Sequence, residues 1–232
     1  MNDEWRVELV KKMKEVESRV KDASGHFLEC QLYAENPDAG DYKERLQSDR
    51  DAVCSQQLVG KLGEWIAWET ISQKYAGVSF PDMTIHPVSK KRYSFDIVVS
   101  GFSRGFAVKS QWRSKLDLGW SFQWAGTRAC DTDRGLFSGN ADKSIVAFVL
   151  VDDNTYEGRV VSFNWMMDLI ERRCFRKPKK RDLREEKVVI YPRKLVDEKM
   201  IRGLDEFEKY SKVLDRWIKT IVEESRNMSW GC

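Results

Sequence analysis

The chain has 232 residues, of which 41% are apolar and 33% charged, and its formal net charge is +3. This composition is typical of a water-soluble globular protein, with room for one full core and a helical appendage. No apolar run approaches the roughly 18 residues that a membrane span requires. Because the N-terminal sequence MNDEWRVELV is charged from its first turn, we expect neither a signal peptide nor a membrane anchor there. We therefore expect a cytoplasmic protein without a membrane partner.

Cysteine and histidine are too few and too scattered for the sites they usually build. The five cysteines stand singly, with no C-x-x-C pair, and the two histidines are His26 and His86. This pattern gives little support for a zinc site, a disulfide framework or a Ser-His-Asp triad. We expect reduced thiols. For His86, a structural or surface role is favoured over a catalytic one.

Helical patterns dominate residues 1–57, which we treat as a helical N-terminal region. Apolar residues recur at spacings of three and four over Trp5–Val20, which predicts an amphipathic helix. Gly25–Gly40 contains a Pro-Asp pair and is expected to be a loop. A second helical region extends from about Asp41 to Gln56, with mixed charges that suit an exposed helix or a DNA-facing arm.

The strongly periodic stretch Leu58–Tyr75 predicts a well-buried helix at the start of the core region, residues 58–195. Gly60 and Gly63 lie inside it. Because glycine is a poor helix former, we expect close packing against another backbone at both positions. Glu64 on the same helix is either an ordinary surface carboxylate or a functional group.

The stretch Tyr93–Gln111 contains two short apolar runs joined by glycine, serine and arginine, which predicts a β-hairpin. Each run carries a charge where a buried strand should have none: Asp96 in the first and Lys109 in the second. Such charges are costly unless they are paired or hold a metal ion. Side chains alternate along a strand, so Ala107, Lys109 and Gln111 share one face, and Asp96 can face the same side.

After the hairpin, predicted strands and helices continue to the C-terminus. The continuous apolar run Ser144–Val151 is consistent with a central strand covered on both faces. Further elements are expected at Val160–Val161 (strand), Asn164–Arg173 (helix, with Ser162 as N-cap), Lys187–Tyr191 (strand) and Leu204–Val222 (helix). The last of these belongs to residues 196–232 and would pack on the core or on a second copy of the chain, as in a homodimer.

Basic residues gather in two places although the net charge is small. Eight lysines and arginines lie between Arg172 and Arg184 against one acid, and another basic group precedes the hairpin. Such clusters attract phosphate backbones, whereas the alternative is a solvated loop that maintains solubility. Tryptophans among cations in Trp112–Asn140 could stack on bases or pack in the core. The residues expected to contact DNA are Lys90, Lys91, Arg92, Arg113, Arg128, Arg176, Lys177, Lys179 and Lys180.

The order of these features resembles the PD-(D/E)XK nuclease superfamily over roughly Leu58–Arg173. A helix carrying a glutamate (GKLGEW) precedes a hairpin with an acid on one strand and a lysine on the next, followed by a hydrophobic strand and a helix. The resemblance implies an α/β fold with a restriction-endonuclease-like core, namely a mixed central sheet of about four to five strands flanked by helices. Helical additions are expected at both ends.

The resemblance also implies roles for individual residues. Asp96 and the backbone carbonyl of Val108 would bind Mg²⁺, or alternatively Mn²⁺, and Glu64 would reach the metal region through a water. Lys109 would orient the attacking water or stabilise charge on the scissile phosphate, and Gln111 would assist. Asp82, which follows Pro81, is the reserve candidate for the metal-binding acid.

Position 107 departs from the superfamily pattern. Where the second metal-binding acid would stand, the chain has Ala107, which cannot bind a metal ion. Either an engineered change to alanine keeps a nuclease inert, or natural loss has left a DNA-binding protein on a nuclease fold. We favour the first because the other site residues are all retained, namely Glu64, Asp96, Lys109 and Gln111.

The sequence thus predicts a Mg²⁺-dependent DNA nuclease, with an endonuclease as the first expectation and an exonuclease or a junction resolvase left open. Restriction, DNA repair, recombination and phage–host defence all use this fold. Two other classes compete with this interpretation. One is a naturally inactive DNA-binding protein on the same fold, and the other is a helical interaction module that binds no nucleic acid.

Overall fold

The structure is a computed structural model that describes residues 26–36, 49–85, 95–102, 104–123, 133–137, 144–177 and 187–209. The expected helix Trp5–Val20 lies outside these ranges, as does most of the expected C-terminal helix, whose first turns are seen at 204–209. Several candidate site residues also lie outside the described residues: His86, Lys90, Lys91, Arg92, Arg128, Lys179 and Lys180.

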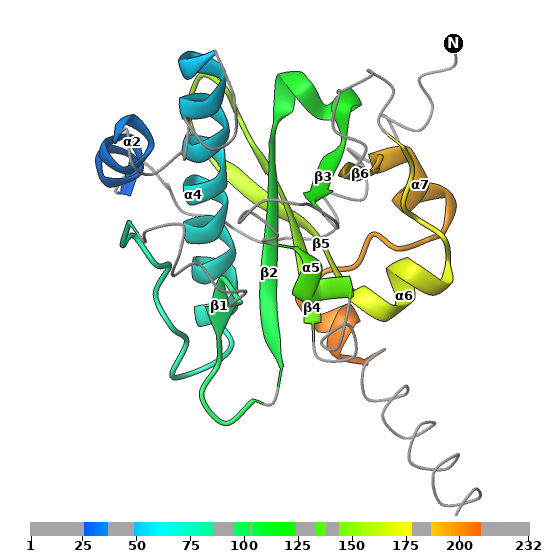
Figure 1. Cartoon of the computed structure of the whole chain (residues 1–232). Helices are drawn as coiled ribbons and strands as arrows, with labels where there is room; N and C mark the ends of the chain where they lie inside the picture. Colours follow the sequence, from blue (N-terminus) through cyan, green and yellow to red (C-terminus); the bar gives the residue numbers. More distant parts are fainter. Residues whose placement is uncertain are drawn as a thin grey trace, which may run out of the picture.

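A mixed four-stranded sheet forms the centre of the molecule (Figure 1). Its strands are β1 (Ile97–Val98), β2 (Gly105–Trp112), β4 (Ser144–Val151) and β5 (Gly158–Trp165), in the order β1-β2-β4-β5. β1 and β2 form the expected antiparallel hairpin, β2 pairs with β4 in parallel, and β4 pairs with β5 antiparallel. This sheet and the helices around it confirm the predicted α/β fold class.

Strand β4 lies inside the sheet with both of its faces covered, as its sequence predicts. All eight of its residues are buried. Alternate side chains enter two separate apolar clusters: Ile145 and Val149 belong to the first, Val146 and Phe148 to the second. Because every residue of β4 is buried, the strand needs no polar face and is apolar after Ser144.

Helix α4 (Arg50–Ser72) packs on the first face of the sheet, and α2 (Phe27–Glu35) packs against α4 (Figure 1). The Asp49 side chain caps α4 by accepting a hydrogen bond from the backbone N–H of Ala52 at 2.9 Å. The boundary expected between residues 57 and 58 therefore falls inside one continuous helix.

The prediction of a loop over Gly25–Gly40 is wrong, because α2 occupies its middle. The segment FLECQLYAE consists largely of residues compatible with a helix and buries Cys30 and Ala34. Asn36 then turns to an extended conformation, as expected for a residue that precedes a proline. The helix-breaking residues at positions 37–40 thus follow the end of α2 in the sequence, whereas the prediction extended one loop over the whole of Gly25–Gly40.

The second face of the central sheet is covered by smaller elements. A two-stranded antiparallel sheet joins β3 (Trp120–Gln123) to β6 (Lys187–Ile190), which confirms the predicted last strand. The other elements are the 3₁₀ helix Arg113–Leu118 and the short helices α5 (Arg134–Phe137), α6 (Met166–Glu171) and α7 (Pro192–Asp197). None of the helices in the described part of the chain is both long and apolar enough to cross a membrane.

Burial and hydrogen bonding settle two further local predictions. Ser162 is not a helix N-cap: it lies in β5, where its hydroxyl donates to the Met200 carbonyl at 2.5 Å. The tryptophans at 112 and 120 pack in the core, with 6% and 0% of their surface exposed, and Trp120 donates its indole N–H to the Val149 carbonyl. These two tryptophans are therefore core residues, and the alternative that they stack on bases is excluded.

The two glycines of α4 differ in what surrounds them. A Cβ at Gly63 would lie 1.7 Å from the Oγ atom and 2.6 Å from the Cβ atom of Ser110, so the helix approaches β2 closely there. A Cβ at Gly60 would meet nothing within 4 Å. Close packing is thus confirmed at Gly63 and wrong at Gly60.

We expect Gly63→Ala to lower the free energy of unfolding by about 1–3 kcal/mol, because the added methyl forces α4 away from β2. Gly60→Ala is the matched control and should raise stability by up to about 1 kcal/mol, since alanine favours the helix. Urea unfolding of the two variants measures both effects. Equal changes in the same direction would contradict the close approach at Gly63.

Candidate functional site

Asp96 is fixed at the start of the hairpin by two backbone contacts. It directly precedes β1, and its N–H donates to the Phe106 carbonyl at 3.0 Å, which extends the pairing of β1 and β2 by one residue. Its Oδ2 atom accepts a hydrogen bond from the Val108 N–H at 2.6 Å. Because Ile97 pairs with Phe106, the next pair in the antiparallel register places Asp96 opposite Ala107.

Lys109 lies on the same face of β2 as Ala107, two residues further along. Phe106 and Val108 belong to the first apolar cluster and Ala107 to the second, so the alternation is clear. The Lys109 ammonium lies 2.5 Å from the Oδ1 atom of Asp133 and 5.1 Å from the centre of the Phe122 ring. The hairpin therefore brings Asp96, Ala107 and Lys109 together on one face.

Burial raises the pKa of the Asp96 carboxyl above its ordinary value. The charge of Lys109 and the hydrogen bond from Val108 act in the opposite direction, and the charge of Asp133 adds to the rise. These influences show that Asp96, Lys109 and Asp133 lie close enough to affect one another electrostatically.

Ala107 contributes only a methyl group to this site. It is 3% exposed and packs in the second apolar cluster with residues of β3 and β4. The position opposite Asp96 is thus apolar and cannot bind a metal ion.

Glu64 lies near Asp96 but forms its contacts with Lys61. The Lys61 ammonium donates to both Glu64 oxygens, at 2.8 and 3.1 Å, and also to the Asp82 carbonyl at 2.7 Å. Burial raises the pKa of Glu64 to about 8, although the Lys61 charge opposes this rise; the charge of Asp96 raises the pKa further. Glu64 is therefore at the edge of the site, in electrostatic reach of Asp96.

Two other candidates have clear local roles. Gln111 donates its side-chain N–H to the Gly119 carbonyl at 2.8 Å and accepts from the Trp112 N–H at 3.0 Å, which secures the connection from β2 to β3. Asp82 is exposed and accepts from the Thr84 N–H at 2.8 Å, as in a turn. The charge of Asp82 also helps to raise the pKa of Glu64, so Asp82 lies in electrostatic reach of that carboxyl.

Asp133 is the site residue that sequence reasoning missed. It directly precedes α5, far along the chain from the hairpin, and its side chain is 8% exposed. In the sequence it stands in the polar stretch DTDR, which shows no periodicity and therefore suggests only a loop. No feature of the sequence distinguishes it from Asp131, two residues earlier.

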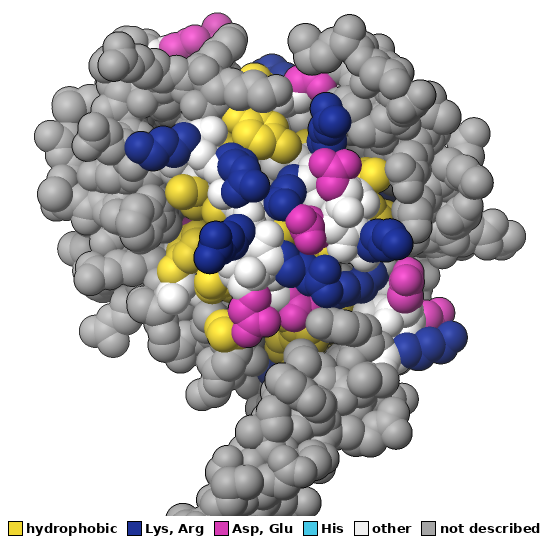
Figure 2. Space-filling view, turned by 90° about the vertical axis from the view of Figure 1, so that its right-hand side faces the viewer, with side chains coloured by type: hydrophobic (Ala, Val, Ile, Leu, Met, Phe, Trp, Pro, Cys, Tyr) yellow, Lys and Arg dark blue, Asp and Glu magenta, His cyan; other side chains and the backbone are white. Residues whose placement is uncertain are grey.

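The predicted DNA-contacting residues that the structure describes lie at the surface. Arg113 is exposed and pairs with Asp152 at 3.4 Å. Arg176 and Lys177 are exposed beyond α6. The face that carries α6 and α7 shows lysine and arginine side chains spread among a smaller number of acidic ones (Figure 2).

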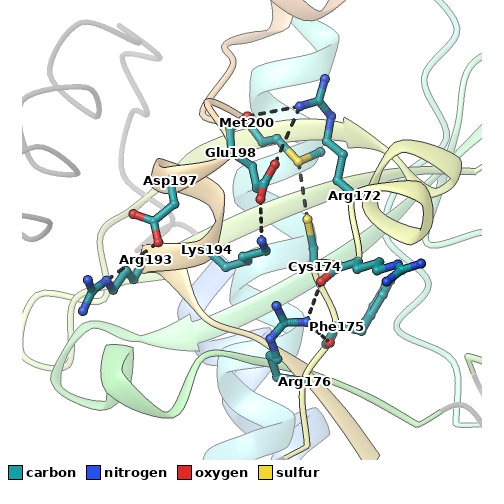
Figure 3. Close-up of polar contacts among 10 residues, drawn as sticks. Arg172, Cys174, Phe175, Arg176, Arg193, Lys194, Asp197, Glu198 and Met200 are labelled. Atoms are coloured by element: carbon teal, nitrogen blue, oxygen red, sulfur yellow. Dashed lines mark hydrogen bonds and ion pairs between the residues drawn. The ribbon is translucent and has the colours of Figure 1, made fainter.

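Some basic side chains on this face pair with carboxylates, whereas Arg176 bonds to backbone carbonyls. Arg172 and Lys194 both reach the Glu198 carboxylate, and Arg193 pairs with Asp197 (Figure 3). Arg176 instead donates to the backbone carbonyls of Arg173 and Phe175, at 2.7 and 3.0 Å (Figure 3). These bonds orient the Arg176 guanidinium without cancelling its charge.

The basic cluster that begins at Arg172 is described by the structure up to residue 177, and we call residues 172–177 the basic segment. Aromatic contacts connect this segment with Lys109. The Phe122 ring, which lies under the Lys109 ammonium, meets the Phe175 ring edge-on with 5.2 Å between their centres. Phe175 is the neighbour of Arg176 in the chain. Two aromatic rings in edge-on contact thus lead from the Lys109 ammonium to the residue that precedes Arg176.

The donor chemistry at Asp96 suits a hard divalent cation. Mg²⁺ commonly takes one or two carboxylates and completes its shell with water and phosphate oxygens. Among the described residues, no three side chains of aspartate, glutamate, histidine or cysteine gather as a metal cage. Asp96 is the residue here that would serve as a carboxylate ligand of such an ion, with water and phosphate oxygens as the other donors.

Comparisons with known proteins add no further information. No protein-family model, curated protein or solved structure matches the chain.

We expect Glu64→Gln to flatten the pH dependence of stability. The Glu64 pKa rises from 4.5 to about 8 on folding, so the folded protein binds a proton that the unfolded chain releases in this range. The free energy of unfolding therefore falls as pH rises through this window, by at most about 1.4 kcal/mol per pH unit from this group.

Urea unfolding at several pH values measures this contribution as the difference between wild type and Glu64→Gln. The exposed Glu157→Gln is the control and should keep the wild-type slope. Parallel pH profiles for wild type and Glu64→Gln would contradict the raised pKa.

Proposed function

We propose that the protein is a Mg²⁺-dependent DNA nuclease of the PD-(D/E)XK type. The observation that supports this most is the placement of Asp96 and Lys109 on the same face of adjacent strands, with Ala107 opposite Asp96. The order of elements agrees with the resemblance: α4 with Glu64, the β1–β2 hairpin, the apolar strand β4 and then α6.

Asp96 and the Val108 carbonyl would hold the metal ion, together with waters and phosphate oxygens. When bound, the ion supplies an activated water and neutralises charge that develops on the phosphate. The Val108 N–H fixes the Asp96 carboxylate. Lys109 would hold its ammonium beside the scissile phosphate and orient the attacking water, because its position over Phe122 limits the freedom of its long side chain.

The DNA backbone would lie across the face that carries Arg176 and Lys177. Their charges are exposed, and the contacts through Phe175 and Phe122 keep this segment near Lys109. A phosphate backbone that follows these cations would pass close to the site.

A DNA-binding protein without catalysis is the second candidate. It is favoured by Ala107, whose methyl group is packed in the apolar cluster as an ordinary core residue. The two candidates differ in what happens when an acid is restored at position 107.

We expect Ala107→Glu to give strong Mg²⁺-dependent cleavage of DNA, because it places a second carboxylate opposite Asp96. Ala107→Glu combined with Lys109→Ala should lose this cleavage while DNA binding changes little. Cleavage of single-stranded, double-stranded and branched DNA is measured with Mg²⁺ or Mn²⁺. Ala107→Gln is the matched control, since it adds the same volume without a charge.

If folded Ala107→Glu protein binds DNA but cuts none of these substrates, the nuclease is excluded and the DNA-binding protein remains. If it neither binds nor cuts DNA, the helical interaction module becomes the better description.

We expect the double variant Arg176→Ala/Lys177→Ala to weaken binding of unrelated DNA sequences alike. The log–log slope of affinity against salt should decrease by about one unit per lost phosphate contact. The control is Arg50→Ala/Arg159→Ala, which removes the same charge from exposed positions on α4 and at the start of β5. Equal slopes for the two double variants would assign Arg176 and Lys177 to solubility.

A further inference from the structure

We infer that Asp133 occupies the place at Lys109 that a DNA phosphate must take, so that the free protein keeps Lys109 paired until the substrate displaces this carboxylate. The inference rests on the proposed function, in particular on the contact between Lys109 and a DNA phosphate. It gives Asp133 a role that the PD-(D/E)XK resemblance does not provide. The ion pair between Lys109 and Asp133 would break, and an ion pair between Lys109 and a phosphate oxygen would form.

The contact between Lys109 and Asp133 is of the kind that lysine forms with phosphate. The Lys109 ammonium donates to the Asp133 Oδ1 atom at 2.5 Å, as a charge-assisted hydrogen bond. Carboxylate and phosphate oxygens are both anionic acceptors, and lysine binds either of them as a compact point charge. Asp133 therefore stands at Lys109 as a chemical substitute for the phosphate.

Burial limits what Lys109 can hold at one time. The side chains of Lys109 and Asp133 are 18% and 8% exposed. The ammonium also lies 5.1 Å from the centre of the buried Phe122 ring. A phosphate that arrived while the carboxylate stayed would place two anions beside one ammonium, in apolar surroundings where their repulsion is strong. The phosphate would therefore replace Asp133 at Lys109.

Asp133 can leave Lys109 without disturbing the central sheet. Lys109 is fixed in β2, where it pairs with Phe148 of β4. Asp133 belongs to no strand: it directly precedes α5, and its carbonyl accepts from the Leu136 N–H at 3.0 Å. Movement of the Asp133 side chain breaks no pairing between strands, so the exchange can be local.

The exchange has a consequence for DNA affinity. In the wild type, the gain from the phosphate contact of Lys109 is offset by the loss of its ion pair with Asp133, so Lys109 adds little to affinity. When the carboxylate is removed, nothing offsets this gain. Asp133→Asn should therefore bind DNA more tightly, although it adds no basic side chain.

Fluorescence anisotropy of a labelled DNA duplex, measured in EDTA so that no cleavage occurs, tests this expectation. Asp133→Asn should bind at least about fivefold more tightly than wild type. Asp168→Asn is the matched control, because Asp168 is 8% exposed in its ion pair with Arg202, as Asp133 is with Lys109. An equal gain in the two variants would show a general effect of lost negative charge and would overturn the inference.

Lys109→Met separates release of the ammonium from simple repulsion between Asp133 and DNA. In the Lys109→Met background, Asp133→Asn should change the affinity by less than about twofold, because no ammonium is left to release. Equal gains from Asp133→Asn with Lys109 and with Met at this position would overturn the exchange. Circular dichroism confirms that each variant is folded.

Cross-linking of the unaltered chain keeps the inference testable if Asp133→Asn does not fold. A carbodiimide joins an amine and a carboxylate in contact as an amide, and the reagent takes up the water that is lost. The cross-link between Lys109 and Asp133, identified by mass spectrometry, should form in the free protein. It should be lost when the protein is saturated with DNA that has no terminal phosphates, whereas an unchanged yield would overturn the exchange.

The outcomes separate this inference from the proposed function. If wild type binds DNA, but the cross-link persists and Asp133→Asn gives no gain, the role of Asp133 is overturned and the nuclease stands. If the exchange occurs but Ala107→Glu cuts no DNA, the inference holds for a DNA-binding protein and the nuclease is excluded. Absence of DNA binding by all of these proteins would remove both proposals.

Discussion

Strand β2 pairs antiparallel with β1 along one edge and parallel with β4 along the other. Every other feature of the candidate site depends on this double pairing. It fixes which residues of β2 face α4 and which face the second apolar cluster, because a shift of register by one residue would exchange the two faces. The close approach of α4 at Gly63 and the pairing with the buried strand β4 both favour this register.

The second face of the sheet combines an apolar core with a few charged groups at its margin. Val146, Phe148 and Phe122 are buried there, and Lys109 lies beside them with its ammonium above the Phe122 ring. A lysine can occupy such a place because its hydrocarbon stem packs on apolar side chains while its charged end finds a carboxylate. The apolar surroundings lower the local dielectric constant, so each charge in the site acts more strongly than it would in water.

The sequence was sufficient for those parts of the fold and the site that local periodicity encodes. The hairpin, the doubly covered β4 and the shared face of Ala107 and Lys109 all follow from alternation along strands. Gly25–Gly40 was misassigned because Pro37 outweighed the helical residues before it. Residue type alone could not distinguish the two glycines of α4: Gly63 lies against β2, whereas Gly60, three residues earlier, faces open space.

Asp133 could not be found in this way, because its place in the site is a property of tertiary structure. Its neighbours in the chain give no periodic signal, and its partner Lys109 is 24 residues away. The contact joins β2 to a residue that follows the 3₁₀ helix and β3 in the chain and directly precedes α5. Such a contact between distant parts of the chain is visible in the structure alone.

Phe122 links the two parts of the proposed function. Its ring contacts the Lys109 ammonium on the sheet side and the Phe175 ring next to the basic segment. A cation–π contact contributes about 0.5–2 kcal/mol and an aromatic pair about 0.5–1.5 kcal/mol, so both contacts are strong enough to orient the groups that they join. β3, which carries Phe122, pairs with β6, and Arg176 forms an isolated antiparallel bridge with Val189 of β6. A phosphate bound at Arg176 would therefore be positioned by the same element that orients Lys109 in the site.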